Sequence, residues 1–475
     1  MEFVTHDEAQ RISSATMSDM TEWLQPNQRP RAALPLGVLD QMIGTLYVPQ
    51  AFCFRETLDA AALKRSLVAT LDRIPVLAGR LAVAPGGRWE VRSQGRGVPF
   101  TTAASAIRWA EWSVDAPLGR ALDGLFHPTV SLRSERRDAP LLTVRLNLLR
   151  GGGSILGVTV HHAIADAASI GLFMRTWSAL HRGHPPPAID LDRLALEARL
   201  LACPAEPAGE AAPRVEPATR RRVFTSGARL ALALVRSESL FVDLPAGPLA
   251  EARRALGRVL AGEGEASRLS AHDVATAALW SMLERLRPTG VARSASVIVD
   301  LRQRLTPRID PGYFGNACVA ILKRPATDGR PARRAASIRT TLLALNDGHA
   351  AANVQSTHAT IFGPRSPLPE VVDALAHGGF MFNSWARNGA YEVDFGAGPP
   401  TWFEPPGMSV SGLVLFMPSP RADGSLVARI SLERGALAAL RRRFGAAIGP
   451  GILDAASSGS TSLCCRNVTP RRSGR

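Results

Sequence analysis

The sequence predicts a mixed α/β fold built from two lobes of similar size. Apolar strands alternate with helical segments in both halves of the 475-residue chain, and a proline-rich stretch separates the halves. Such alternation is typical of α/β domains. Hydrophobic residues make up 46% of the sequence and charged residues 20%. This composition can bury a large core and excludes a broadly disordered chain.

The first half opens with a strand over 47–56, followed by a helix that Asp59 caps and that stops before Pro75. Leucines recur on one face of this helix at positions 63, 67 and 71. A short strand, "GRWEVRS", follows the proline-glycine turn at 85–87. The segment thus predicts a strand, a helix and a second strand in succession.

A hairpin and a helix complete the first half. Two apolar strands over 141–162 flank the three glycines 151–153, which can supply the positive φ angles of a tight turn. Small residues follow, and then Ile170, Phe173 and Trp177 recur at helical spacing until Gly183 ends the run.

The second half repeats this mixture of elements. "SLFVDLP" and "ASVIVDLRQRL" are predicted strands, and between them Ser270 and Asp273 form a capping box at the start of a helix. A further hairpin turns near Asp423-Gly424. We therefore expect an N-terminal lobe over 1–184, a crossover linker over 185–222, a C-terminal lobe over 223–454 and a disordered tail over 455–475.

The net charge and the cysteine content limit which partners and which cellular compartment the sequence predicts. The net charge is +15, and all but two of the 56 basic residues are arginines. They are dispersed and lack an aromatic–basic motif, so we expect no nucleic acid partner. No secretory signal and no apolar run of about 18 residues is present, so we expect a cytoplasmic protein without a membrane partner. Five cysteines without a CxxC pair argue against a disulfide framework.

The segment "GVTVHHAIADAASIGLFMRTW" carries the strongest chemical signal. His162 stands at the end of an apolar strand and small residues follow it, which would leave room for substrates. A neutral imidazole can take a proton from a hydroxyl or amine that attacks a carbonyl, and a placed base contributes about 10²–10⁴-fold. Asp166 follows four residues later, but spacing alone leaves open whether it touches the ring or pairs elsewhere.

Other interpretations of His162 are a packed structural histidine and a metal ligand. A metal site needs about three protein ligands, which His161, His162 and Asp166 nominally supply. Adjacent residues of a strand point to opposite faces, so the two imidazoles should diverge and we expect no metal. The sequence holds no GxSxG, P-loop or GxGxxG motif that would indicate a serine nucleophile or a nucleotide site.

Several segments, in the same order, resemble the BAHD acyltransferases. "HHAIADA" resembles their HHxxxDG motif, and "NSWARNGAYEVDFGAG" resembles their SW…DFGWG segment. "VDLRQRLTPRIDPGYFGNA" and "LKRSLVATLDRIPVLAGRL" are similar to two further family stretches, and "LPLGVLDQ" fits the family's opening. The resemblance spans 34–444, and fungal members that acetylate trichothecene hydroxyls look closest. The DFGAG segment separates the chain from peptide-synthetase condensation domains.

The resemblance implies two lobes similar to chloramphenicol acetyltransferase, with a solvent channel between them and His162 at its middle. It implies a monomer without a permanently bound cofactor, which moves an acyl group, acetyl in our expectation, from acyl-coenzyme A to a hydroxyl of a secondary metabolite. His162 would be the general base in a ternary complex. The alternatives are an N-acyltransferase, a carrier-protein-dependent condensation-type transferase, and a degenerate binding protein that keeps the channel without turnover.

The resemblance also implies roles for other residues. Asp166 would turn away from the ring and pair with Arg302, or else with Arg304, to hold the shape of the loop. Trp385 would either donate its indole N–H toward the oxyanion or substrate, a contribution of about 3–4 kcal/mol, or only pack the channel wall. Asn383 stands where some members carry a hydroxyl residue.

Asp394, Phe395 and Gly396 correspond to the family's DFGWG loop, where the resemblance implies a structural role away from the chemistry. The chain departs from the family pattern at two positions. Ala167 replaces the glycine after Asp166, and it would cost about 1 kcal/mol if that position needs a positive φ. Ala397 replaces the tryptophan of DFGWG and so removes a large packing group.

Overall fold

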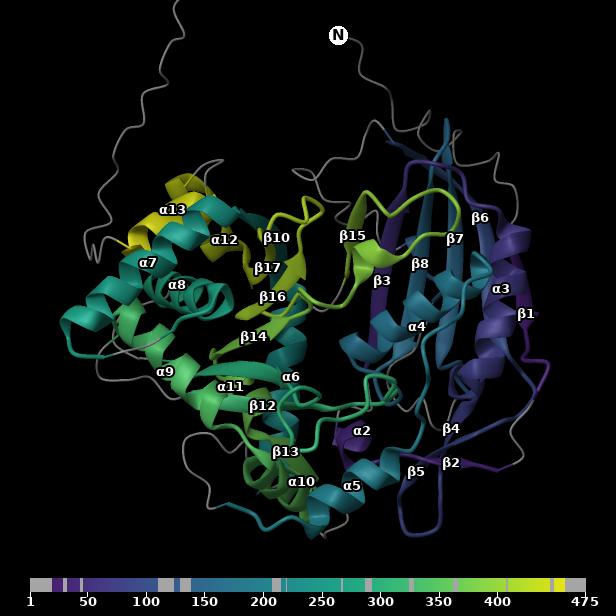
Figure 1. Ribbon diagram of the computed structural model, residues 1–475, viewed down its shortest axis with the longest axis horizontal. Coiled ribbons are helices and arrows are strands. Elements are labelled where there is room, and N and C mark those ends of the chain that lie inside the picture. The colour runs from purple at the N-terminus through teal and green to yellow at the C-terminus, as the bar shows by residue number, and fades with distance from the viewer. Residues whose placement is uncertain are drawn as a thin grey trace, which may run out of the picture.

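The protein folds into two α/β lobes that lie side by side (Figure 1). Most of the first half of the chain forms one lobe, drawn purple to blue, and most of the second half forms the other, drawn teal to yellow. This computed structural model describes residues 19–28, 32–42, 46–109, 124–128, 138–206, 215–218, 220–265, 268–286, 293–323, 329–361, 366–406, 409–444 and 448–457.

The N-terminal lobe is built on a six-stranded sheet. Its order is β1 (Met20–Leu24), β6 (Val98–Arg108), β7 (Leu142–Arg150), β8 (Ser154–His161), β3 (Tyr47–Phe54) and β15 (Trp402–Glu404). A smaller sheet joins β2 (Leu34–Pro35), β5 (Trp89–Arg92) and β4 (Arg80–Val83). The helices of this lobe include α2 (Val38–Met42), α3 (Ala60–Arg73) and α4 (Ala167–His181).

Local sequence signals account for these elements. Asp59 caps α3 by accepting hydrogen bonds from the backbone N–H groups of Ala61 and Ala62, at 2.8 and 3.1 Å. The three glycines between β7 and β8 all have positive φ, near 90–107°. Leucines of α3, together with Phe173 and Trp177 of α4, are buried against the sheet. The predicted hairpin, cap and helices of this half are confirmed.

The C-terminal lobe has a second six-stranded sheet, in the order β10 (Ser237–Leu244), β17 (Leu426–Glu433), β16 (Leu413–Pro418), β14 (Phe380–Ser384), β11 (Ala295–Asp300) and β12 (Cys318–Lys323). Its helices include α7 (Ala246–Gly262), α8 (Ala271–Arg285), α9 (Pro331–Ala344), α10 (Asp347–Ile361), α11 (Glu370–Ala376), α12 (Arg434–Phe444) and α13 (Ile448–Ser457). The capping box of Ser270 and Asp273 is present at the start of α8, and Gly424 turns the β16–β17 hairpin with φ of 87°.

The expected segment boundaries differ from the structure in two ways. β15 comes from the 223–454 segment, yet it pairs with β3 and completes the sheet of the N-terminal lobe. The 185–222 segment holds the helix α5 (Arg193–Ala202), the strand β9 (Val215–Ala218) and the start of α6 (Arg220–Arg236). Asp192 caps α5, a local signal that the proline-rich surroundings obscured. β9 pairs with β13 (Ser366–Pro369). The expected tail began at 455, but residues 455–457 are the last turn of α13 (Ile448–Ser457), and its remainder from 458 onward lies outside the described residues.

A cluster of buried apolar side chains lies where the two sheets meet. Cys53, Ile155 and Trp402 of the N-terminal sheet pack in one buried cluster with Leu415 and Met417 of the C-terminal sheet. The helices of the described segments include none long and apolar enough to cross a membrane. The cysteines at 53, 203 and 318 are free thiols.

Candidate active site

His162 lies in the turn that links β8 to α4 in the N-terminal lobe. Its backbone N–H donates to the carbonyl of Leu46 at 2.7 Å, which fixes the turn against the start of β3. His162 is partly exposed as a residue, whereas His161 is fully buried and packs edge-on against the Tyr47 ring, with ring centroids 4.6 Å apart. In the described parts of the chain no cluster of three metal-ligating side chains is present.

Asn316 fixes which ring nitrogen of His162 carries the proton. The amide Nδ2 of Asn316 donates to two acceptors, the carboxylate of Asp40 and the backbone carbonyl of His162, each at 2.8 Å. Because those partners only accept, the amide oxygen must be the atom that faces the ring, 3.2 Å from His162 Nδ1. An amide oxygen only accepts, so Nδ1 bears the hydrogen and Nε2 keeps the basic lone pair.

Behind Asn316 stands a buried ion pair. Arg193, at the start of α5, donates to Asp40 at 3.0 Å and to the backbone carbonyl of Ile164 at 2.8 Å. Asp40 also accepts from the backbone N–H groups of Gly37 and Asn316, each at 3.0 Å. Every oxygen of this carboxylate is thus satisfied, and it holds Asn316 rigidly because each partner comes from a packed segment.

Burial lowers the pKa of His162 below its ordinary value of 6.5, against the opposing effects of its own backbone carbonyl, Asp166, Asn316 and Asp40. Burial likewise lowers the pKa of His161, to about 3, and the neighbouring His162 ring adds to the effect. A general base must be unprotonated to act. The environment therefore favours the neutral form of the His162 imidazole at neutral pH.

Asp166 forms an ion pair with Arg302. The two donor nitrogens of Arg302 reach the two carboxylate oxygens at 2.8 and 3.0 Å, in a bidentate pair. The same carboxylate accepts from the backbone N–H of Ser169, which caps α4, and from that of Ala317. Arg304, the second candidate partner, instead donates to the backbone carbonyl of Leu342.

The electrostatics of this pair favour the charged forms. Burial would raise the pKa of Asp166, but the charge and hydrogen bonds of Arg302 and the backbone donors hold it below its ordinary value. Burial would lower the pKa of Arg302, and Asp166 raises it well above its usual range. Arg302 also donates to the backbone carbonyl of Gly315 at 3.0 Å. The pair therefore ties the turn after His162 to the segment that carries Asn316.

Ala167 carries no strain. It is the first residue of α4, and it is absent from the positive-φ residues of the described segments. The cost of about 1 kcal/mol that a positive φ would impose on Ala167 therefore does not arise. Alanine also suits the first turn of a helix, because it is the best helix former.

Trp385 and Asn383 lie at the C-terminal end of β14, on the other lobe. Trp385 is partly buried and packs against the apolar cluster of the N-terminal lobe and against the cluster where the two sheets meet, and its backbone N–H donates to the carbonyl of Phe416 at 2.7 Å. Asn383 is partly buried within β14, opposite Leu415 of β16. Both residues therefore belong to the region where the lobes meet.

The DFGAG loop lies at the opposite end of α4 from His162. Asp394 accepts from the backbone N–H groups of Gly396 and Gly398 at 2.8 and 3.0 Å, and it pairs with Arg182 at 3.2 Å. Phe395 is buried and meets the Trp177 ring edge-on at 4.9 Å. Gly396 has φ of 85°, which a side chain would disfavour. These contacts set the shape of the loop and lie outside the hydrogen bonds around His162.

Sequence reasoning missed Asp40, Asn316 and Arg193. Asp40 lies in "LPLGVLDQ" and Asn316 in "GYFGNA", both of which resemble family stretches, so the segments were found but not the roles of these residues. Arg193 lies in the range assigned to a linker. Nothing in the local pattern distinguishes these polar residues from solvated ones, because their partners are remote in sequence.

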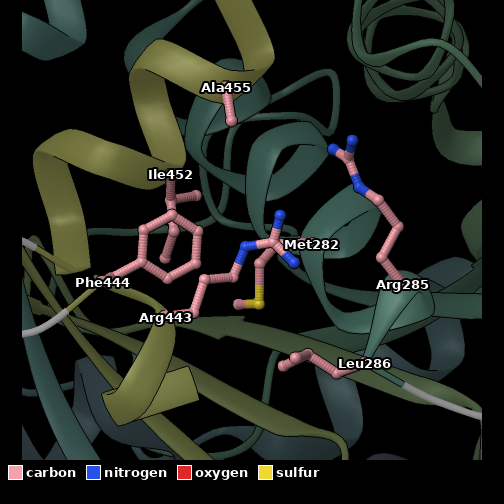
Figure 2. A pocket seen from close by; sticks show the side chains of 7 residues that line it. All are labelled: Met282, Arg285, Leu286, Arg443, Phe444, Ile452 and Ala455. Atoms are coloured by element: carbon pink, nitrogen blue, oxygen red, sulfur yellow. The ribbon is translucent and has the colours of Figure 1, made fainter. Parts of the chain in front are cut away.

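Two of the hollows found in the described structure are very small, and a third is open to solvent. A cavity of about 10 Å³ lies behind the site, between Asp40, Asn316 and α5. Another of about 10 Å³ lies between α8, α12 and α13, where Figure 2 shows Arg285 and Arg443 around apolar side chains such as Met282 and Ile452. A cavity of this size holds about one water, so neither is a substrate pocket. A hollow of about 500 Å³ opens on the outer surface of α7.

Comparisons with known proteins identify the family. The model of the Transferase family, the BAHD acyltransferases, matches residues 20–446. The chain belongs to this family. It is therefore a coenzyme A-dependent acyltransferase with the two-lobe fold. Hydroxycinnamoyltransferase 2 of Oryza sativa subsp. japonica is 28% identical over 434 residues, which cover 86% of this chain and 93% of the relative.

Other BAHD relatives extend this picture. Putrescine hydroxycinnamoyltransferase 1 of Oryza sativa subsp. japonica is 26% identical over 441 residues, covering 87% of this chain and 95% of the relative. Among solved structures, F. graminearum TRI101 complexed with coenzyme A and T-2 mycotoxin has a TM-score of 0.70 at 19% identity, covering 86% of this chain and 97% of that one. At such identity the structural likeness shows the fold.

Proposed function

We propose that this BAHD member transfers an acyl group from acyl-coenzyme A to a hydroxyl of a secondary metabolite, with His162 as the general base. The observation that carries the proposal is the hydrogen bond that His162 Nδ1–H donates to the amide oxygen of Asn316, which leaves Nε2 as the basic atom of a partly exposed residue. The acceptor and the thioester would reach this ring through a channel between the lobes. A TRI101 structure with coenzyme A and T-2 mycotoxin bound together supports a ternary arrangement.

The chemistry follows from a base placed beside a thioester. His162 Nε2 takes the acceptor's proton while the acceptor oxygen bonds to the thioester carbonyl carbon. The tetrahedral intermediate then collapses, the carbon–sulfur bond breaks, and the thiolate of coenzyme A takes the proton back from the imidazolium. No acyl-enzyme forms. The net charge of +15 favours the approach of an anionic coenzyme A ester.

Two further roles belong to the same proposal. Trp385 donates its indole N–H toward the developing oxyanion or the substrate, and Asn383 contributes a polar contact to the acceptor. Their placement at the end of β14, where both lobes contribute apolar contacts, supports this. Replacing Trp385 by Phe keeps the packing but removes the donor, so kcat should fall by about 10²–10³-fold if the N–H stabilises the oxyanion.

Transfer to an amine is the second candidate, because relatives named putrescine and agmatine hydroxycinnamoyltransferase match along most of this chain. The same imidazole can deprotonate an amine as it adds to the carbonyl. The acyl group is the other open choice: we expect acetyl, while the curated relatives carry hydroxycinnamoyl in their names. The protein is expected to act as a monomer in the cytoplasm.

A thiol-release screen tests the proposal. Acetyl-coenzyme A and 4-hydroxycinnamoyl-coenzyme A are each supplied with a panel of alcohols and amines, and an acyl-carrier protein serves as the alternative donor. Acceptor-dependent release of coenzyme A, with an ester detected by mass spectrometry, supports the proposal. Amides alone would indicate the N-acyltransferase, and turnover of the carrier-bound donor alone the condensation-type enzyme. No thiol release with any acceptor would indicate a binding protein without turnover.

A further inference from the structure

Helix α6 presents an apolar stripe to solvent on one side. Phe224, Leu232 and Val235 are 76%, 49% and 72% exposed. Phe224, Ala228, Ala231 and Val235 follow one another at spacings of four and three, which place them on a single face. Along the helix this stripe is about 16 Å long. Exposed apolar side chains scattered singly are ordinary, but a contiguous row marks an interaction surface.

The opposite face of α6 is the one that anchors it. The buried Ser226 donates its hydroxyl hydrogen bond to Asp373 of α11 at 2.6 Å, and Arg222 pairs with the same carboxylate at 2.7 Å. Two residues along a helix correspond to a rotation of about 200°. Phe224 therefore points away from the side that Ser226 holds against the protein, and the stripe is not needed for that attachment.

Arginines lie along one side of the stripe. Arg229 and Arg236 lie seven residues apart, in a row beside Leu232, and Arg221 lies close to Leu232 around the helix. Arg222 begins the same row but turns toward the anchoring side, where it pairs with Asp373. All four are exposed. The helix contains no acidic residue in its 17 positions. The arrangement of an apolar stripe with an arginine border is that of helices that lie in the interface of a membrane.

We propose that α6 docks the protein on an anionic phospholipid surface, with the apolar stripe in the headgroup region and the arginines against the lipid phosphates. The positive charge of α6 distinguishes an anionic lipid surface from other partners that could cover this face. A second copy of this chain would bring the same arginine row against this one, and the net charge of +15 adds to that repulsion. A nucleic acid would satisfy the arginines but not the apolar stripe. This inference goes beyond the proposed function and reverses the expectation that the protein has no membrane partner.

Vesicle co-sedimentation tests the proposal with the full chain. Vesicles of phosphatidylcholine with 30% phosphatidylglycerol (about one anionic lipid in three) are compared with vesicles of pure phosphatidylcholine. The wild-type protein should sediment with the anionic vesicles, and the binding should weaken as salt is raised. The variant F224S/L232S/V235S should partition about 100-fold more weakly. R229Q/R236Q should partition about 10-fold more weakly.

Matched controls come from other helices of the same lobe. Leu343→Ser in α9 removes an apolar side chain that is 70% exposed, and R254Q/R258Q removes two exposed arginines of α7. Both controls should bind vesicles as the wild type does. All variants should melt at the wild-type temperature and acylate a water-soluble acceptor at the wild-type rate.

Four results would overturn the proposal: no sedimentation with anionic vesicles, wild-type binding by the triple variant, equal loss in the α7 control, or displacement by duplex DNA at equal charge concentration. A change from dimer to monomer in the triple variant would assign the stripe to self-association instead. Since binding is read without turnover, its failure is distinct from failure of the acyltransferase proposal.

Discussion

The two ends of α4 hold the two family motifs, and they differ in kind. At its N-terminus, the turn of His162 and Asp166 is held by a hydrogen-bond network of side chains from remote segments, namely Asp40, Arg302 and Asn316. At its C-terminus, the DFGAG loop folds on itself, with Asp394 accepting from Gly396 and Gly398. The first end orients a titratable ring, while the second sets the shape of a loop. Motif resemblance alone does not reveal that difference; the hydrogen bonds do.

The largest expected effect separates the two ends directly. His162→Ala should lower kcat by about 10²–10⁴-fold, because the base is removed. His181→Ala, at the other end of α4, should retain kcat. Circular dichroism melts should show both variants folded. Full activity of the His162 variant would remove the general base from the proposal and the contrast between the two ends with it.

A change at Asp166 should affect stability more than chemistry. Asp166→Asn leaves Arg302 buried without its bidentate partner, which typically costs about 3–5 kcal/mol. Asp300→Asn is the matched control, because Asp300 also accepts from Arg302 at 3.1 Å but its side chain is half exposed. That control should cost no more than about 1 kcal/mol. Urea unfolding measures both, and equal losses would contradict the structural role of Asp166.

The orientation of the base can be tested separately from its presence. Asn316→Ala removes the acceptor that fixes the protonated nitrogen of His162, so kcat should fall by about 10²-fold, part of what the base contributes. Asn147→Ala is the control: Asn147 is equally buried, but its amide donates to the carbonyls of Leu125 and Ile155. The control should lose stability and keep kcat. If Asn316→Ala lowers only stability, Asn316 positions the lobes and not the ring.

The pH dependence of kcat/KM tests the protonation state of the proposed base, His162. Because burial lowers the pKa of His162, its neutral form persists below the ordinary value of 6.5. The rate constant kcat/KM should therefore stay level as pH falls through 6.5 and decline only at lower pH, as the ring of the free enzyme takes up a proton. In Asn316→Ala the apparent pKa should fall further, since Asn316 favours the charged ring. An acid limb above pH 6.5 would contradict the lowered pKa of His162.

The sequence predicts features whose interacting residues are close together in the chain, and it misses features that join residues far apart in the chain. Caps, turns and helices were predicted because their signals are local: Asp59 with Ala61 and the capping box of Ser270 each lie within a few residues. The pairing of Asp166 with Arg302 came from family resemblance. Asp40 and Asn316 are 276 residues apart, and no periodicity connects them. The entry of β15 into the first sheet is likewise a long-range pairing that strand propensity cannot locate.

The smallest effect belongs to the loop at the far end of α4. Asp394→Ala removes an acceptor for two backbone N–H groups and the partner of the partly exposed Arg182, so the expected loss is about 1 kcal/mol. The kcat should stay at the wild-type value, since none of these bonds reaches His162. A fall in kcat as large as that of Asn316→Ala would show that the loop acts on the chemistry. The two ends of α4 would then be one coupled unit, joined through the packing of Trp177 and Phe395.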